Sequence, residues 1–276
     1  MNICRHSTAG AFLRKAQAWL QLAEAENNLV LGVARRSRRN PAADTADSYW
    51  ATIEIDGAVR GAAFRTYPHN LGLTRLPAKA VPLLAADVRQ RYSSIPGVSG
   101  PLMDATRFAD TWCTQSGKCR IELLNLRIHI LVEVAVLTNP PSGCLRPGTD
   151  ADLMLATEWM SRFSDDAHAT HIAPELGEQL LRARQLFFWD DGGPRSMAGT
   201  SRDTPNGACI SAVYTPPEYR GLGYATAAVA ALSQALLDSG KKFCCLYTDL
   251  ANPTSNSIYR RIGYLPIQDA IDIKFG

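Results

Sequence analysis

The chain has 276 residues, 46% of them hydrophobic and 20% charged, which is enough apolar material for one large or two ordinary soluble domains. Charge is unevenly divided: residues 1–147 hold 18 Lys and Arg against 11 Asp and Glu, and residues 148–276 hold 11 against 15. Long apolar runs and an apolar N-terminal core are missing, so we expect neither a membrane span nor a secretory signal.

The seven cysteines form no Cys-x-x-Cys pair, which disfavours a structural zinc site and suits a reducing, cytoplasmic setting. We therefore expect no metal. The basic run Arg35-Arg36-Ser37-Arg38-Arg39 lacks interleaved aromatic residues, so we interpret it as a solvated surface and expect no nucleic-acid or membrane partner.

Helical and strand patterns alternate through the first half. Apolar residues three and four positions apart predict an amphipathic helix near its start. Asp56-Gly57 separates two apolar runs, which indicates a hairpin turn. The expected elements are a helix over Ala11–Asn27, a polar loop over Arg35–Asp47, strands over Tyr49–Ile55 and Ala58–Thr66, helices over Pro77–Arg91 and Pro101–Gln115 around a turn-rich Ser93–Gly100, and one long or two bent strands over Arg120–Leu137.

Pro140-Pro141-Ser142-Gly143 and Pro147-Gly148 form the strongest linker signal, so we expect two domains, 1–147 and 148–276. A second hairpin turn is predicted at Asp190–Gly193. The other elements expected after the linker are a helix capped by Asp150 or Asp152 and running to about Phe163, a helix over Ala173–Arg184, strands over Gln185–Trp189, Arg195–Thr200 and Ala208–Val213, a helix over Thr226–Asp238 ended by Gly240, a strand ending at Asp249, and a helix over Pro253–Ile262 with Gly263 as its C-cap.

The segment Val213–Ala225 connects a predicted buried strand to a predicted helix and contains Arg220, Gly221 and Gly223. Glycines let backbone N–H groups approach an anion, and the helix N-terminus adds positive potential. The segment therefore predicts a phosphate-binding loop.

Two common phosphate loops fit less well. A Walker loop needs Gly-Lys-Ser/Thr, which this chain lacks here. A dinucleotide loop has a third glycine where this chain has Thr226, and it usually opens a domain, although Asp249 lies where a ribose-binding acid would fall.

Arg220-Gly-Leu-Gly-Tyr-Ala225 resembles the Arg/Gln-x-x-Gly-x-Gly/Ala pyrophosphate loop of the GNAT superfamily of acetyl-CoA-dependent N-acetyltransferases. Downstream, the segment from Asp249 to Tyr264 resembles the last conserved helix of that superfamily, in the same order and spacing. The resemblance covers about Asp150 to the C-terminus. It implies a mixed α/β GNAT acyltransferase fold for the C-terminal half, with acetyl-CoA as co-substrate.

The resemblance also implies roles for individual residues. Tyr259 matches the general acid, although a tyrosine beside Ile258 could simply pack in the core. Asn252 before Pro253 also fits an ordinary helix N-cap, and Pro216-Pro217 depart from the usual loop entrance. The cofactor-binding residues implied are Val213, Tyr214 and Thr215 for the pantetheine arm, Arg220, Gly221, Leu222, Gly223, Tyr224, Ala225 and Thr226 for the pyrophosphate, and Asn252 and Ser255.

The general base and the acceptor are less defined. Asp249 is the first candidate for the base, because an amine with a pKa of roughly 10 is mostly protonated at neutral pH. Glu158, Asp165 and Asp166 are candidates for the acceptor pocket, with His168 and His171 as weaker ones. The acidic second half suits a small cationic amine, such as the aminosugar of an aminoglycoside antibiotic; polyamines, aminoacyl groups and protein N-termini stay open.

The sequence therefore predicts an enzyme that transfers an acetyl group directly to a primary amine. An acyl-CoA-binding regulatory module without turnover is the rival. The N-terminal half follows the same element order, but Tyr67–Thr74, in the place of the phosphate loop, lacks the arginine and the glycine pair. We interpret this half as a degenerate copy of the fold, with an unrelated α+β extension as the alternative.

Overall fold

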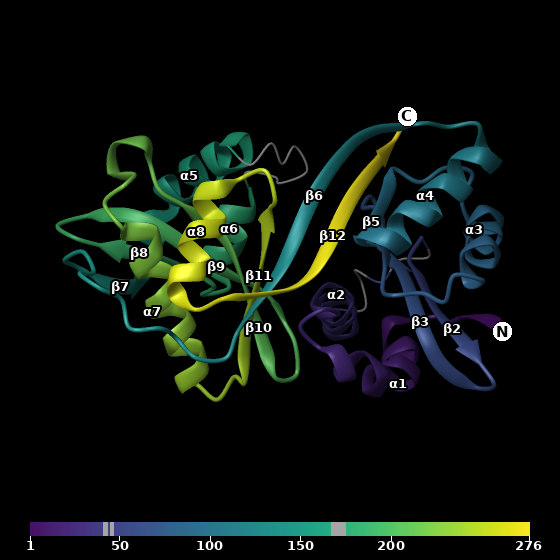
Figure 1. Ribbon diagram of the computed structural model, residues 1–276. Coiled ribbons are helices and arrows are strands. Elements are labelled where there is room, and N and C mark those ends of the chain that lie inside the picture. The colour runs from purple at the N-terminus through teal and green to yellow at the C-terminus, as the bar shows by residue number, and fades with distance from the viewer. Residues whose placement is uncertain (41–43, 45–46, 167–174) are drawn as a thin grey trace. The chain divides into compact units, whose positions relative to one another are not determined.

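The computed structural model describes residues 1–40, 44, 47–166 and 175–276, and these residues form two compact units (Figure 1). Unit 1 comprises Met1–Ile128, Thr248–Ala251 and Pro266–Gly276, and unit 2 comprises His129–Tyr247 and Asn252–Leu265. The first ten main elements are β1 (Asn2–Arg5), α1 (Ala9–Leu20), α2 (Asn28–Arg39), β2 (Tyr49–Ile55), β3 (Ala58–Arg65), β4 (Leu71–Leu73), α3 (Ala80–Arg91), β5 (Gly97–Pro101), α4 (Leu102–Ser116) and β6 (Arg120–Leu131). The next ten are β7 (Cys144–Pro147), α5 (Leu153–Asp166), α6 (Glu175–Arg182), β8 (Leu186–Asp190), β9 (Pro194–Asp203), β10 (Gly207–Tyr214), α7 (Tyr224–Asp238), β11 (Phe243–Asp249), α8 (Pro253–Ile262) and β12 (Leu265–Phe275).

These two sets follow the same order: strand, two helices, three strands, helix, strand, helix, strand. The chain is thus an internal repeat of one mixed α/β fold. This confirms the interpretation of the N-terminal half as a second copy of the fold.

The last strand of the chain lies in the sheet of unit 1. β12 pairs antiparallel with β5, from Ala270 opposite Pro101 to Lys274 opposite Gly97, and the strand order in unit 1 is β1-β2-β3-β4-β5-β12-β6. Because the C-terminal strand completes this sheet, the compact units do not coincide with the expected division at residues 147 and 148.

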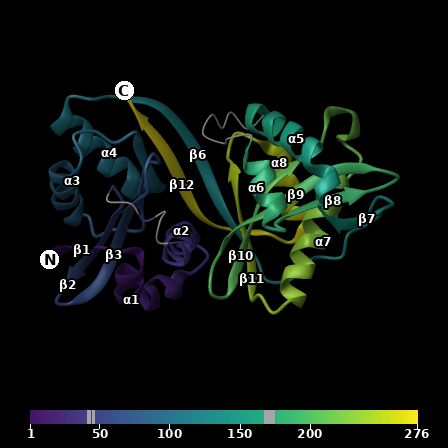
Figure 2. The same cartoon turned by 180° about the vertical axis from the view of Figure 1, so that it is seen from behind.

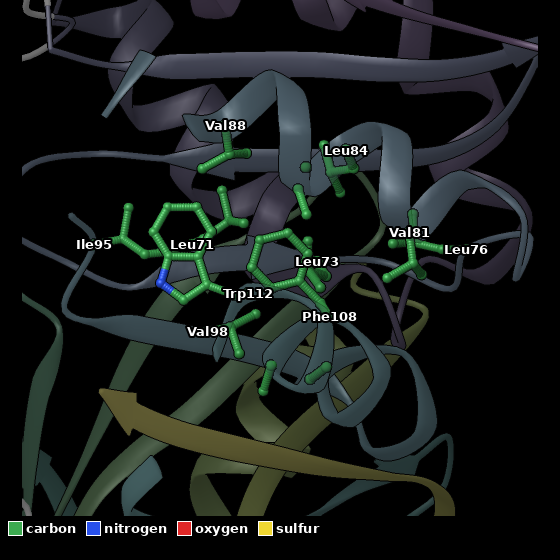
Figure 3. Close-up of a cluster of buried hydrophobic side chains, with 14 of the residues drawn as sticks. Leu71, Leu73, Leu76, Val81, Leu84, Val88, Ile95, Val98, Phe108 and Trp112 are labelled. Atoms are coloured by element: carbon green, nitrogen blue, oxygen red, sulfur yellow. The ribbon is translucent and has the colours of Figure 1, made fainter. Parts of the chain in front are cut away.

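Each face of the unit 1 sheet is covered by a helix pair. One core contains Trp112 and Phe108 from α4 together with side chains of α3, β4 and β5 (Figure 3). The two rings stack at 6.0 Å between centroids, and side chains of β12 complete this core. The other face packs against α1 and α2, where Trp50 lies between Phe12 and Phe64.

Unit 2 has the same layering on the sheet β11-β10-β9-β8-β7. The core on one face combines α7 and α8 with Ile210, Cys244 and Leu246. The opposite face packs against α5 and α6 (Figure 2). There the ring of Trp159 contacts the rings of Phe188 and Tyr214. Since both faces are covered, strand residues alternate between two buried environments.

The predicted loop over Arg35–Asp47 is wrong for its first five residues, which form the last turns of α2. The helix forms because Val30, Leu31 and Ala34 face the core, while Arg36, Arg38 and Arg39 lie in the last turn, where cations interact favourably with the helix dipole. The single helix predicted over Ala11–Asn27 is in fact α1 and a separate short 3-10 turn.

Three further expectations are corrected. Leu71–Leu73 is a strand, so the counterpart of the phosphate loop in unit 1 is residues 74–79 before α3, not Tyr67–Thr74. The turn-rich Ser93–Gly100 contains most of β5, and β7 lies within the predicted linker, because backbone pairing with neighbouring strands outweighs the local turn propensity.

Thr149, rather than Asp150 or Asp152, caps the first helical turns of unit 2. Its side chain and that of Asp152 form a reciprocal capping box. Asp152 also binds Arg146, whose guanidinium reaches Asp190 as well, and this arginine lowers the pKa of Asp152 to about 2. The start of α5 is therefore tied to the β7–β8 pair by a charged network.

None of the helices in the described part of the chain has the length and apolar character that a membrane crossing requires. The seven cysteines all lie in the described part and are free thiols.

Replacing Ile273 by alanine should destabilise unit 1 by roughly 2–5 kcal/mol, because the side chain is fully buried in a core shared by β5, α4 and β12. Chemical unfolding followed by tryptophan fluorescence measures the change. Lys274→Ala, next to it on the same strand, is the control and should shift the midpoint little, since its ion pair with Glu122 is exposed. Equal effects of the two substitutions would show that β12 is not part of this core.

Candidate functional site

The strands β10 and β11 pair in parallel only at their starts. Their paired residues in the described chain run from Gly207 opposite Phe243 to Cys209 opposite Cys245, although β10 continues to Tyr214. Beyond Cys209 the edge of β10 that faces β11 therefore presents peptide groups free to bond a ligand. Such an edge suits an extended chain that contains amides.

A β-bulge lies at the same place on the other edge of β10. Ser211 is opposite Gly199 and Tyr214 is opposite Met197, so β10 carries one residue more than β9 over this stretch. Ala212 adopts φ of 51°, a left-handed conformation that is strained for a residue with a side chain. The bulge turns the backbone of Ala212 and Val213 relative to the rest of the strand.

The loop after β10 has the geometry predicted for a phosphate site. Gly221 and Gly223 have φ of 79° and 88°, and Gly223 is the N-cap of α7. Because Gly223 has no side chain, the helix lacks a capping side chain, and its first backbone bond runs from Ala227 N to Gly223 O at 3.0 Å. The N–H groups of Tyr224, Ala225 and Thr226 precede that bond, so they are left for a ligand.

The space at Gly221 is open, whereas Pro141 lies beside Gly223. A Cβ placed on Gly221 would meet no atom within 4 Å, and Leu222 is 57% exposed. Pro216 and Pro217 start a short 3-10 turn, closed by a 2.9 Å bond from Tyr219 N to Pro216 O. The prolines therefore fix the approach to the loop without filling it.

Arg220 is folded back over the end of β10. Its Nε donates to Thr215 O at 2.9 Å, and its Nη2 bonds to Asp166 Oδ2 at 2.5 Å. Both side chains of this ion pair are about half exposed, 49% and 51%, so the pair contributes little free energy and can be exchanged for a phosphate. Asp166, a candidate for the acceptor pocket, is thereby bonded to an arginine of the phosphate loop.

Two residues near the loop had no sequence signal. Arg195, at the start of β9, stacks on the ring of Tyr219 at 4.6 Å, and its Nε bonds to Asp191 O. Asp191 accepts a 2.7 Å hydrogen bond from Tyr224 OH, which lowers the pKa of this carboxyl. The β8–β9 turn thereby holds the side chain of Tyr224 and supplies a second arginine beside the loop.

Tyr259 lies on α8, in the core between α7, α8 and the sheet. It is 8% exposed and packs edge-to-face with Tyr264 at 5.9 Å between centroids. Burial, and after it the charge of Cys209, raises the pKa of Tyr259 above that of a free phenol. Its hydroxyl has no hydrogen-bond partner among the residues that the structure describes. The side chain therefore packs as a core residue and also stays protonated, as a proton donor must.

Asn252 is the N-cap of α8, as its place before Pro253 predicted, and its Oδ1 accepts from Ser255 N at 3.0 Å. Asp249 Oδ1 accepts from Ala251 N at 2.8 Å in a local turn, and its segment belongs to unit 1. Its role as general base stays a prediction.

The remaining predicted acidic residues lie on the surface of α5. Glu158 forms an exposed 2.7 Å pair with Arg162 one turn away, and Asp165 is exposed. His168 and His171 lie outside the described residues. Across the described part of the chain, no group of His, Cys, Asp or Glu side chains could hold a metal ion.

The described residues of unit 1 contain no comparable loop at the equivalent place. The equivalent residues 74–79, Thr-Arg-Leu-Pro-Ala-Lys, contain no glycine, and α3 begins without a side-chain cap. A pocket of about 320 Å³ lies at this end of unit 1, lined by Arg75, Asp104, Gln268 and neighbouring residues. The copy in unit 1 has thus kept the fold and a pocket but not the anion-binding loop.

Comparison with known families and structures fits this geometry. Residues 191–271, which include the loop, α7 and α8, match the family model described as FR47-like protein. No curated protein sequence matches the chain.

Solved structures resemble the chain along its whole length. A protein from Drosophila has a TM-score of 0.70 at 11% identity, with 99% of this chain and 98% of that one covered. An acetyltransferase of the GNAT family from Colwellia psychrerythraea has 0.57 at 12%, covering both chains fully. A tandem GNAT protein from the clavulanic acid biosynthesis pathway has 0.54 at 12%, with 100% and 98% covered. Together these similarities show that the chain has the GNAT fold in both halves.

Asp166→Asn should strengthen coenzyme A binding about 2–5-fold at low ionic strength, because it releases Arg220 from an exposed ion pair worth at most about 1 kcal/mol. Titration calorimetry measures the dissociation constant. Glu178→Gln, which removes another exposed acid of unit 2 from its pair with Arg182, is the control and should leave it unchanged. Weaker binding by Asp166→Asn would mean that the ion pair holds the loop in its binding shape.

Proposed function

We propose that this chain is a coenzyme A-dependent N-acetyltransferase that moves an acetyl group from acetyl-CoA directly to a primary amine of a small acceptor. One observation carries the proposal: beyond Cys209 the strands β10 and β11 no longer pair, and the opening that this leaves along β10 ends at the glycine loop at the start of α7. A fold alone does not define an activity, so the argument rests on what these groups can do.

Binding of acetyl-CoA uses backbone groups. The amides of the pantetheine arm can bond the open edge of β10 at Val213, Tyr214 and Thr215. The diphosphate can bind the N–H groups from Gly221 to Thr226, with Arg220 and Arg195 as nearby cations. Arg220 bonds both Thr215 O and Asp166, so these two bonds are the ones that acetyl-CoA would replace.

Acetyl transfer then proceeds without a covalent enzyme intermediate. The neutral amine attacks the thioester carbonyl, the C–S bond breaks, and the amine loses a proton to a base, for which Asp249 is the first candidate. Tyr259 donates a proton to the departing thiolate and is reprotonated from solvent. Since burial raises the pKa of Tyr259, it stays in the donor form at neutral pH.

The acceptor class is a separate part of the proposal. The acidic balance of residues 148–276 suits a cationic acceptor such as an aminoglycoside-type aminosugar, whose modification would confer antibiotic resistance. However, seven of the fifteen acids behind that balance are already paired within the described part of the chain. Those in ion pairs are Asp152, Glu158, Asp166, Glu178, Asp190, Asp203 and Asp269. A reducing, cytoplasmic setting fits the free thiols.

Tyr259→Phe should lower kcat for thiol release by about 10²-fold or more, because it removes the proton donor, while KM for acetyl-CoA should change little. A thiol-release assay with a panel of primary amines measures both. Tyr264→Phe is the matched control: it removes a phenol hydroxyl from the same core, one that is bonded to Ser233 at 2.8 Å, and should keep the turnover.

The assay also separates the proposal from the rival. Acetyl-CoA binding without turnover of any amine would favour an acyl-CoA-binding regulatory module. Equal kcat for wild type and Tyr259→Phe would remove the phenol from the mechanism while leaving the binding site in place.

A further inference from the structure

Arg202 on β9 is a charged side chain that pairs with no carboxylate among the described residues. Its Nη2 lies 2.9 Å from Cys209 Sγ, and its guanidinium carbon lies 4.8 Å from the ring centroid of Tyr247. Its Nε is buried and has no hydrogen-bond partner, and no carboxylate of the described residues pairs with it. Arg146 in the same unit differs, because two carboxylates bind it.

The guanidinium of Arg202 lies where β10 and β11 part. Cys209 and Cys245 are the last paired residues of these strands, and Tyr247 lies two residues beyond Cys245, beside the opening. Their neighbours Ile210 and Cys244 face the core under α7 and α8. Because side chains alternate along a strand, Cys209 and Cys245 face the opposite side of the sheet. Arg202, which bonds Cys209, therefore lies on that opposite side. The phosphate loop and α7 thus lie on one side of the opening and Arg202 on the other.

An arginine is always charged, and burying its donors without acceptors costs free energy. The Cys209 thiol satisfies only part of this requirement. A hydrogen bond from Cys245, with Arg202 as a further cause, lowers the pKa of Cys209. The sulfur is therefore a good acceptor, but it bonds only one donor of the guanidinium, Nη2. The Nε–H group still lacks an acceptor. A planar guanidinium is suited to a carboxylate or phosphate that approaches from the open side.

Building on the proposed acetyltransferase activity, we propose that the acceptor carries a carboxylate or phosphate near its amine, and that Arg202 binds this anionic group. The acceptor class is then an amino acid-like zwitterion or an amino phosphate, not a polycationic aminosugar. Arg202 is a specificity-determining residue, since it binds the non-reacting end of the acceptor and places the amine at the opening where the thioester is held.

The consequence for specificity can be estimated. A hydrogen bond to a charged group contributes about 1.5–3 kcal/mol, which corresponds to roughly 10–100-fold in kcat/KM. An acceptor without the anion leaves the guanidinium donors of Arg202 buried and unpaired. The free energy lost in this way is what makes such a site reject the analogue strongly.

The test compares matched pairs of amines that differ only in the anion. Suitable pairs are amino acids with the amines obtained by removing their carboxylate, and phosphoethanolamine with ethanolamine; aminoglycosides form a third arm. Wild type should prefer the anionic member of a pair by about 10-fold or more in kcat/KM. Arg202→Gln should lose this preference through a higher acceptor KM, and Arg202→Lys, which keeps the charge but not the fork, should retain part of it. The two anionic arms distinguish carboxylate from phosphate.

Arg182→Gln is the control, because it removes an exposed arginine of the same unit and should keep the wild-type preference. Thermal unfolding and the dissociation constant of coenzyme A verify that each variant is folded. The inference is overturned if wild type acetylates both members of the pairs equally or prefers aminoglycosides. It is also overturned if Arg202→Gln lowers kcat/KM for both members by the same factor.

Failure of the activity itself gives a different result. If no amine is acetylated, calorimetric titration of the same pairs into the coenzyme A-loaded protein decides the question. Tighter binding of the anionic member by wild type, lost in Arg202→Gln, supports the anion site even though the proposed activity fails. Equal binding of both members, or no binding of either, overturns it.

Discussion

The parting of β10 from β11 beyond Cys209 and Cys245 is the constraint on which the site depends. A paired sheet edge has no free peptide groups, so a ligand with amides can lie in unit 2 only where pairing stops. The bulge with the strained Ala212 lies in this unpaired part of β10, on the edge that pairs with β9. Strain at that point persists because the surrounding cores fix the strand on both faces, and such positions are typical of ligand sites.

The repeat explains why one chain needs both units. β12 carries Ile271, Ile273 and Phe275 into the core of unit 1, so the last strand of the second copy completes the sheet of the first. Loss of unit 1 would leave this strand unpaired and would expose its apolar face. Unit 1 can therefore be retained for its contribution to stability alone. This is consistent with its structure, which has the sheet and helix layers of the fold but no glycines at residues 74–79.

Local signals were readable from the sequence, and contacts between distant segments were not. The glycine loop, the Asn252-Pro253 helix start and both hairpin turns depend on backbone preferences of a few residues, and the structure has them. α2 was missed because its polar face resembles a loop, and β5 because its pairing with β12 joins residues far apart in sequence. Arg202 gave no signal either: it became notable only when three strands placed it beside Cys209 and Tyr247 without an acid.

Net charge was a poor guide to the site for a related reason. The second half of the chain is acidic overall, yet seven of its fifteen carboxylates form ion pairs with arginines or lysines among the described residues. Cations lie on both sides of the parting strands: the N-terminus of α7 with Arg195 and Arg220 on one side, where Asp166 and Asp191 also lie, and Arg202 on the other. A ligand responds to the groups within a few ångströms, because charges farther away are screened by water and salt. An opening with positive groups on both sides suits two anionic ends, the diphosphate of the donor and an acid group on the acceptor, with the amine and the thioester meeting between them.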